Sequence, residues 1–260
     1  MYKSVCLLAA SVAGLGLLAA SAQNGQPGAG PGPQLSGATA KLFGDNQTFS
    51  ATLQIQTSDS AGHNASLAGV LIFDAGKSRF QVDMADSKSA QMTPQTAAQM
   101  KALGMDQVIA INRPDKKVAY LIFPGLQSYV ESDLSGTESS ESTNHDYKLE
   151  TVKLGNETVS GHDCVKNKVT LTDQDGHSHE FMVWNAPDLK KFPLKIQTVA
   201  ENSSVIMLFG NITLAKPEAA LFEAPSGYAK YPNQQTMYQQ QVLKRVGAAG
   251  APPPPGQPGQ

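Results

Sequence analysis

The sequence contains little cysteine and no excess of charge of either sign. Among its 260 residues there are two cysteines, and 20 lysines and arginines stand against 22 aspartates and glutamates. Two cysteines cannot build a disulfide-rich scaffold or a four-thiolate zinc site. A near-neutral balance provides neither the basic surface that grips nucleic acid nor a polybasic segment that holds an anionic membrane. We therefore expect no nucleic-acid partner.

The sequence also lacks the short motifs of common enzymes. It has no Gly-x-Ser-x-Gly elbow, no His-Glu-x-x-His pair and no Walker A loop. Residues of the types that bind zinc occur close together, but a strand rise of about 3.3 Å per residue puts Cys164 about 20 Å from His179 in a hairpin. An exposed histidine pair, His177 and His179, stays open as a metal-binding alternative. We expect no enzyme, no cofactor and no metal site.

The first 22 residues are typical of a signal peptide. Lys3 supplies one positive charge, the apolar run Val5–Ala20 follows, and Ala20-Ser21-Ala22 has the form that signal peptidase accepts. The run is 16 residues long, whereas a helix needs about 20 to cross a bilayer. We expect cleavage before Gln23, no transmembrane anchor in the mature chain, and export to the periplasm of a Gram-negative bacterium or secretion. Cys164 then remains as the only cysteine, and we expect it to be buried.

Two segments of low complexity flank the rest of the chain. Residues 23–40 are rich in glycine and proline, and residues 247–260 include the run Pro252–Pro255. Neither segment has an apolar periodicity with which to bury surface, so we predict a disordered linker and a disordered proline-rich tail. Between them, residues 41–246 are numerous enough to form one domain with a single core.

Within this domain, strand signals dominate and two helices interrupt them. Short β-branched and aromatic runs alternate with period two between turn residues, and crossover helices are missing, which predicts an antiparallel sheet of about ten strands. Thr93 is a predicted N-cap for a helix that ends near Gly104, and Asn233–Val246 has helical spacing. The predicted class is therefore α+β. The expected strands are 49–55, 67–73, 79–84, 107–112, 117–123, 147–154, 163–172, 177–184, 194–200 and 205–214.

The second half of the chain carries an ordered series of landmarks. They are Gly155, Glu157, Gly161, Cys164 and Lys166, then Trp184, then Pro193 and Lys195, and finally Phe222, Pro225, Gly227 and Tyr228. From the residues alone, we expect the two glycines at 155 and 161 to bracket a tight connection and Glu157 to be solvated. In this order and spacing, the landmarks resemble those of uncharacterised bacterial secreted domains related to the outer-membrane lipoprotein carriers and receptors (LolA/LolB-like). The resemblance covers roughly residues 42–232.

This resemblance implies a strongly curved antiparallel sheet that forms an unclosed barrel, with helices on its concave side and an apolar cavity between them. It suggests a monomeric, non-catalytic periplasmic protein that binds a hydrophobic small molecule, an acyl chain or a lipoprotein. The alternative is an envelope structural or interaction module with a filled core and a proline-rich docking tail. Methionines around the first helix fit either a filled core or a movable helix. The predicted cavity lining is Leu53, Ile55, Leu71, Phe73, Phe80, Val82, Met100 and Leu103.

Overall fold

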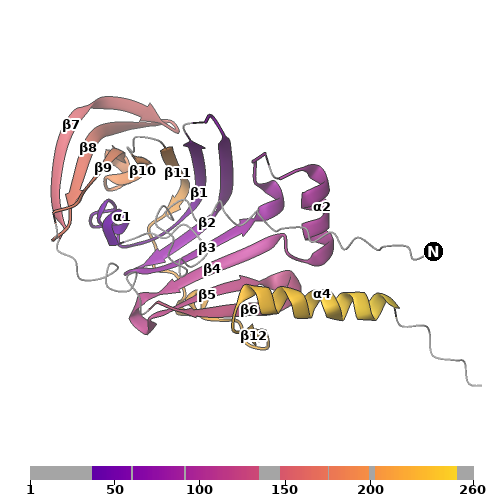
Figure 1. The fold of residues 1–260 in the computed structure, drawn as a ribbon. Helices are drawn as coiled ribbons and strands as arrows, with labels where there is room; N and C mark the ends of the chain where they lie inside the picture. Colours follow the sequence, from indigo (N-terminus) through magenta and orange to yellow (C-terminus); the bar gives the residue numbers. More distant parts are fainter. Residues whose placement is uncertain are drawn as a thin grey trace, which may run out of the picture.

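One curved sheet dominates the structure (Figure 1). In the computed structural model it contains twelve strands, in the order β12-β6-β5-β4-β3-β2-β1-β11-β10-β9-β8-β7. The structure describes residues 37–59, 61–90, 92–134, 147–174, 176–198 and 203–250. The strands are β1 (Thr48–Asp59), β2 (Asn64–Asp74), β3 (Lys77–Asp83), β4 (Gln107–Arg113), β5 (Val118–Phe123), β6 (Ser128–Asp133), β7 (Lys148–Val159), β8 (His162–Thr172), β9 (Ser178–Ala186), β10 (Phe192–Thr198), β11 (Ser203–Thr213) and β12 (Ala229–Tyr231).

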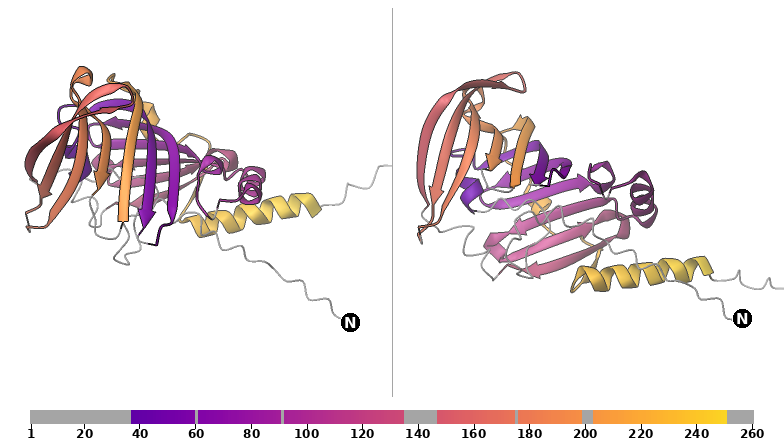
Figure 2. Two further views of the ribbon diagram at one scale, coloured as in Figure 1. Left: turned by 90° about the horizontal axis from the view of Figure 1, so that it is seen from above. Right: turned by 45° about the horizontal axis from the view of Figure 1, so that its top comes forward.

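Three α-helices accompany the sheet in the described part of the chain. Helix α1 (Gly37–Lys41) lies inside the curve made by β7–β11, and α2 (Pro94–Leu103) lies beside the ends of the central strands (Figures 1 and 2). Helix α4 (Gln234–Gly250) contacts β6 and β12 and then projects beyond the sheet. Neither these helices nor any other described segment combines the length and apolar composition that a helical membrane span needs.

The curved, unclosed and mainly antiparallel sheet is confirmed, but two strands were missing from the prediction. Strand β6 is short and largely polar, and β12 has only three residues, so neither has the apolar alternation by which strands are recognised. Strand β12 also pairs with β6 in parallel, because the chain crosses the sheet before it returns to this edge. The described fold is mainly β with three α-helices, whereas the sequence predicted an α+β class that is rich in strands and has two helices.

Both ends of the folded part extend further than predicted. Helix α1 begins at Gly37, within the segment expected to be a linker, and Thr39 is already buried. Helix α4 passes Gly247 and ends at Gly250, since the two alanines there favour helix and a single glycine is tolerated. The predicted signal peptide, the linker before residue 37 and the tail beyond residue 250 lie outside the described residues.

The sheet has an apolar core on each face. On the concave side, the register places Leu71 of β2 opposite Ala51 of β1 and Phe80 of β3, and these three side chains are at most 3% exposed. On the opposite side, a smaller cluster on β4 and β5 is covered by Phe222, which belongs to the 3-10 turn η6 (Ala219–Phe222). The segment between β11 and β12 therefore forms a second layer on the outer face of the sheet.

Gly69 of β2 is a position where the concave core leaves no room for a side chain. A Cβ atom there would overlap the Gln81 carbonyl oxygen and lie 2.8 Å from atoms of the Phe80 ring. We expect Gly69→Ala to lower the free energy of unfolding by about 1–3 kcal/mol, because backbone and ring must shift to accept the methyl group. Gly210→Ala in β11 is the matched control, since its nearest contact would be Thr52 Oγ1 at 3.1 Å. Urea denaturation of both variants measures the difference, and equal losses would contradict this packing argument.

Candidate functional site

The predicted lining residues on the strands share one face of the sheet. The register places Leu53 opposite Gly69, and Gly69 opposite Val82, so the side chains at 53 and 82 face the concave side. These side chains are packed in the concave core, and their role in ligand contact stays a prediction. Ile55 is half-buried. The other five are at most 3% exposed: Leu53, Leu71, Phe73, Phe80 and Val82.

The two predicted helix residues lie in different environments. Helix α2 has the predicted caps, since Thr93 Oγ1 accepts a hydrogen bond from the Thr96 N–H (3.1 Å) and Gly104 adopts the left-handed conformation. Met100 is half-buried and packs against the concave cluster. Leu103 is 37% exposed and points to solvent along much of its surface. Only Met100 of this pair is therefore joined to the other predicted lining residues.

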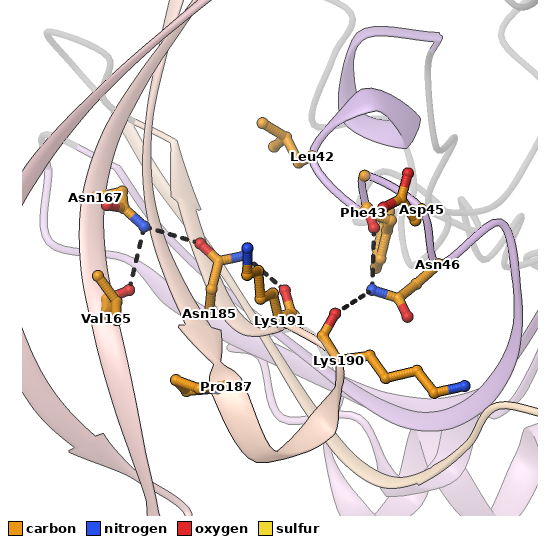
Figure 3. A pocket seen from close by; sticks show the side chains of 11 residues that line it. Leu42, Phe43, Asp45, Asn46, Val165, Asn167, Asn185, Pro187, Lys190 and Lys191 are labelled. Carbon is orange, nitrogen blue, oxygen red and sulfur yellow. Dashed lines mark hydrogen bonds between the residues drawn. The ribbon is translucent and has the colours of Figure 1, made fainter.

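A pocket of about 400 Å³ opens elsewhere on the concave side. It lies between the segment that follows α1 and the wall formed by β8, β9 and the turn after β9 (Figure 3). Leu42, Phe43, Val165 and Pro187 give it an apolar surface. The remaining lining residues are Gly44, Asp45, Asn46, Asn167, Asn185, Lys190 and Lys191.

Three asparagine side chains around this pocket are held by hydrogen bonds within the protein (Figure 3). Asn46 Nδ2 donates to the carbonyl oxygens of Phe43 (3.2 Å) and Lys190 (3.1 Å). Asn167 Nδ2 donates to Asn185 Oδ1 (3.0 Å), and Asn185 Nδ2 donates to the Lys191 carbonyl oxygen (2.9 Å). An apolar group can lie against these amides without separating a donor from its acceptor, which avoids the main cost of burying polar atoms.

Phe43 separates the pocket from the concave core. Its ring lines the pocket and also lies 4.8–6.2 Å from the rings of four other phenylalanines, measured between ring centroids. Those partners come from β1, β2, β10 and β11, so the ring fills the space inside the curve. The four partners are Phe49, Phe73, Phe192 and Phe209.

Sequence reasoning did not find this pocket. Its two sides are about 120 residues apart in the chain, and neither side carries a motif. The one signal available is that Asn167 and Asn185 replace apolar residues on the core-facing positions of their strands. In the register, Asn167 lies opposite Lys153 and Asn185 lies opposite Val165. Both asparagines are on the same face of the sheet as the core residue Val183.

Four of the sequence landmarks meet on the outer face of the same strands. Because strand residues alternate between faces, Lys166 and Trp184 point away from the pocket. The Trp184 ring centroid lies 4.9 Å from Lys166 Nζ and 4.1 Å from Lys195 Nζ. Glu157 pairs with Lys166 at 3.2 Å, and the neighbouring Trp184 indole and Lys166 ammonium hold the pKa of its carboxyl below the usual range. Glu157 is exposed, as expected, and the ion pair with Lys166 is a contact that the sequence did not predict.

The described residues include no cluster of metal-ligand type. Groups of three or more histidine, cysteine, aspartate or glutamate side chains that could hold a metal do not occur in the part of the chain covered by the structure. Cys164 is 1% exposed, as predicted, and burial raises the pKa of its thiol. His177 Nδ1 pairs with Asp173 at 3.1 Å, and His162 Nδ1 pairs with Asp188 at 2.6 Å.

One family model and several solved structures match this chain. The family model described as "Domain of unknown function (DUF4412)" matches residues 70–192. An uncharacterized conserved protein from Thermus thermophilus is 12% identical, with 74% of this chain and 94% of that chain covered and a TM-score of 0.42. A LolA superfamily protein from Nitrosomonas europaea is 10% identical (71% and 93% covered, TM-score 0.34). The likeness expected from the landmarks is confirmed.

A third structure is the lipoprotein LppX from Mycobacterium tuberculosis, which is 11% identical, with 69% of this chain and 95% of that chain covered and a TM-score of 0.37. The search of curated proteins found no match. At these identities and TM-scores, the matches assign no role to any residue of this chain.

Proposed function

We propose that the protein is a non-catalytic binder of a hydrophobic ligand, which it holds on the concave side of the curved sheet. The observation that supports this most directly is the pocket beside Phe43, with its apolar surface and three asparagine side chains whose NH₂ groups donate within the protein. Its volume of about 400 Å³ falls within the range of about 300–1,000 Å³ typical of small-molecule sites. An acyl chain, free or attached to a lipoprotein, is the ligand class that this surface suits.

The strength of such binding depends on how many methylene groups enter the pocket. Each buried CH₂ contributes about 0.8 kcal/mol, and association costs at least about 4 kcal/mol in lost freedom. A chain that buries only a few methylenes would therefore bind weakly. A long acyl chain that fills the pocket would gain more free energy from burial than association costs. We propose that the protein acts in the periplasm, after export directed by residues 1–22.

A second candidate function is a structural or interaction module of the envelope. The observation that favours it is the packed concave core, because Leu53, Leu71 and Phe73 are at most 1% exposed where a ligand cavity was predicted. In this alternative the partner would dock on the proline-rich tail, and Pro252–Pro255 lies outside the described residues. The two functions differ in whether the pocket takes up a hydrophobic probe.

Filling the pocket with a large side chain tests the binding function. Val165 is half-buried and lines the pocket, so we expect Val165→Trp to occupy its volume and to weaken binding of a fluorescent fatty acid by at least about tenfold. The matched control is Val152→Trp on the neighbouring strand β7, where the side chain is 58% exposed. Fluorescence titration gives the affinities, and denaturation curves confirm that both variants fold.

The outcomes separate the two functions. Uptake by the wild type and the Val152 variant, with loss in the Val165 variant, supports binding in this pocket. A wild-type protein that takes up no probe and carries no lipid after purification from its own envelope would contradict the binding function. Loss of partner capture on deletion of residues 251–260, with probe uptake unchanged, would support the interaction module instead.

A further inference from the structure

The turn between β9 and β10 has an unusual backbone. It begins with the 3-10 turn η5 (Pro187–Leu189) and continues through two consecutive left-handed residues, Lys190 (φ 53°) and Lys191 (φ 58°). The left-handed region is unfavourable for residues other than glycine. The other described pairs of consecutive residues with positive φ each include a glycine, Ala75-Gly76 and Ser160-Gly161. The lysine pair therefore occupies a position where glycine would be the less strained choice.

Two other turns of this chain show a simpler form of the same connection. The 3-10 turns η3 (Pro114–Lys116) and η4 (Pro124–Leu126) also begin with proline, but each is followed by a single left-handed residue. The N–H of that residue donates back to the proline carbonyl oxygen, at 3.1 Å from Lys117 and 3.0 Å from Gln127. The turn after β9 has one residue more, and that residue is Lys191.

The pocket asparagines hold this strained turn in place. Asn46 donates to the carbonyl oxygen of Lys190 and Asn185 to that of Lys191, and both asparagines line the pocket together with the two lysines. The side chains of Lys190 and Lys191 are exposed at the rim, and Figure 3 shows the Lys190 side chain extending from the pocket. Both lysines line the pocket, so the extra left-handed residue adds a second lysine to its lining.

These two ammonium groups have no acidic partner among the described residues. Lys190 and Lys191 form no ion pair with any described residue, as is true of several other described lysines, whereas lysines 77, 116, 148, 166, 168 and 230 each pair with an aspartate or glutamate. Asp45 is the only carboxylate among the eleven residues that line the pocket. The rim therefore carries two positive charges against one negative charge.

We propose that Lys190 and Lys191 bind the anionic head group, a carboxylate or a phosphate, of a ligand whose apolar part occupies the pocket. This inference rests on the proposed binding function and adds the chemical class of the ligand to it. Ammonium groups on flexible stems suit an anion that lies at the water-exposed end of a bound chain. The strain of the turn is then retained because it brings the second lysine to the rim.

Three probes with fourteen carbon atoms each test this inference: myristate, tetradecyl phosphate and tetradecan-1-ol. We expect the wild type to bind the two anionic probes about tenfold more tightly than the alcohol, from the combined effect of two exposed ion pairs. The double variant Lys190→Gln/Lys191→Gln should lose this preference and keep its affinity for the alcohol. The control Lys101→Gln/Lys117→Gln removes two exposed lysines away from the pocket and should keep the preference. Isothermal titration at low and high salt gives the affinities.

Lys191→Gly adds a readout that does not depend on charge alone. Glycine relieves the left-handed strain, so this variant should melt at a higher temperature than the wild type while its preference for anionic probes falls. Equal binding of all three probes by the wild type would overturn the head-group assignment and leave the proposed function standing. Failure to bind any alkyl probe would contradict the proposed function itself. Binding of inorganic phosphate as tightly as tetradecyl phosphate would overturn the assignment to a chain-bearing ligand.

Discussion

Phe43→Ala should destabilise the protein by about 3–5 kcal/mol, the usual cost of removing a fully buried phenylalanine. Phe43 is 1% exposed, and its ring contacts four other aromatic rings contributed by four strands. The substitution removes all of these contacts at once, in addition to the transfer free energy of the ring. Because the partners belong to a rigid sheet, the surrounding side chains can collapse only partly into the space.

The control for this prediction is Val152→Ala, since Val152 is 58% exposed on the edge strand β7 and should cost at most about 0.5 kcal/mol. Urea denaturation followed by tryptophan fluorescence suits the measurement, because Trp184 is the single tryptophan of the chain and is 1% exposed. A loss below about 1 kcal/mol for Phe43→Ala would show that the segment after α1 does not support the core.

The same variant distinguishes a binder from a filled scaffold. Phe43 lines the pocket and separates it from the core, so its removal joins the pocket to a new apolar space. If the pocket binds acyl chains, the enlarged site should favour long chains. The ratio of the affinity for a longer chain to that for a shorter chain should be higher in the variant than in the wild type. A scaffold would lose stability without any such change in chain-length preference.

Much of the sheet could be predicted because its signals are local. Period-two alternation identified the long strands, and the caps at Thr93 and Gly104 identified α2 within a residue of its ends. Strands β6 and β12 escaped prediction because they are short and polar and are held by their neighbours rather than by their own apolar face. Local pattern therefore predicts the elements that bury their own side chains.

Neither the pocket nor the group formed by Lys166, Trp184 and Lys195 on the outer face could be predicted from local pattern. The pocket depends on contact between residues 42–46 and residues 165–191, which no local pattern encodes. The turn at Lys190 and Lys191 gives no sequence signal either, because lysine is not a residue that favours positive φ. By contrast, the gathering of Lys166, Trp184 and Lys195 follows from hairpin register, so correct strand pairing alone would have placed them together.

Arg113→Met should destabilise the protein by about 2–4 kcal/mol, because it removes a buried cation that ties the outer layer to the sheet. The Arg113 side chain is 9% exposed and binds Asp115 of the η3 turn at 2.7 Å. It also pairs with Glu223 and donates to the Phe222 carbonyl oxygen at 3.3 Å, which anchors the segment that covers β4 and β5. Methionine fills similar space but leaves Asp115 and the Phe222 carbonyl oxygen without this donor, while Glu223 keeps only Lys116.

The effect of Arg113→Met should depend on pH in a defined direction. Arg113 lowers the pKa of the Asp115 carboxyl, and Lys116 together with Arg113 lowers the pKa of the Glu223 carboxyl. A carboxyl whose pKa is lower in the folded state stabilises the fold above its unfolded pKa of about 4, and this contribution disappears as the pH falls through the folded value. The stability gap between wild type and variant should therefore be widest near neutral pH and should narrow below about pH 4.

Lys148→Met provides the matched control for Arg113→Met, because Lys148 also pairs with a carboxylate, Glu150, at 2.8 Å, but its side chain is 73% exposed. Water screens this pair and replaces its partner, so its loss should cost at most about 0.5 kcal/mol. Urea denaturation at pH 7 and at pH 3.5 measures both variants against the wild type. A pH-independent loss for Arg113→Met would mean that the arginine acts through packing alone, and a loss as small as that of the control would mean that Phe222 stays in place without it.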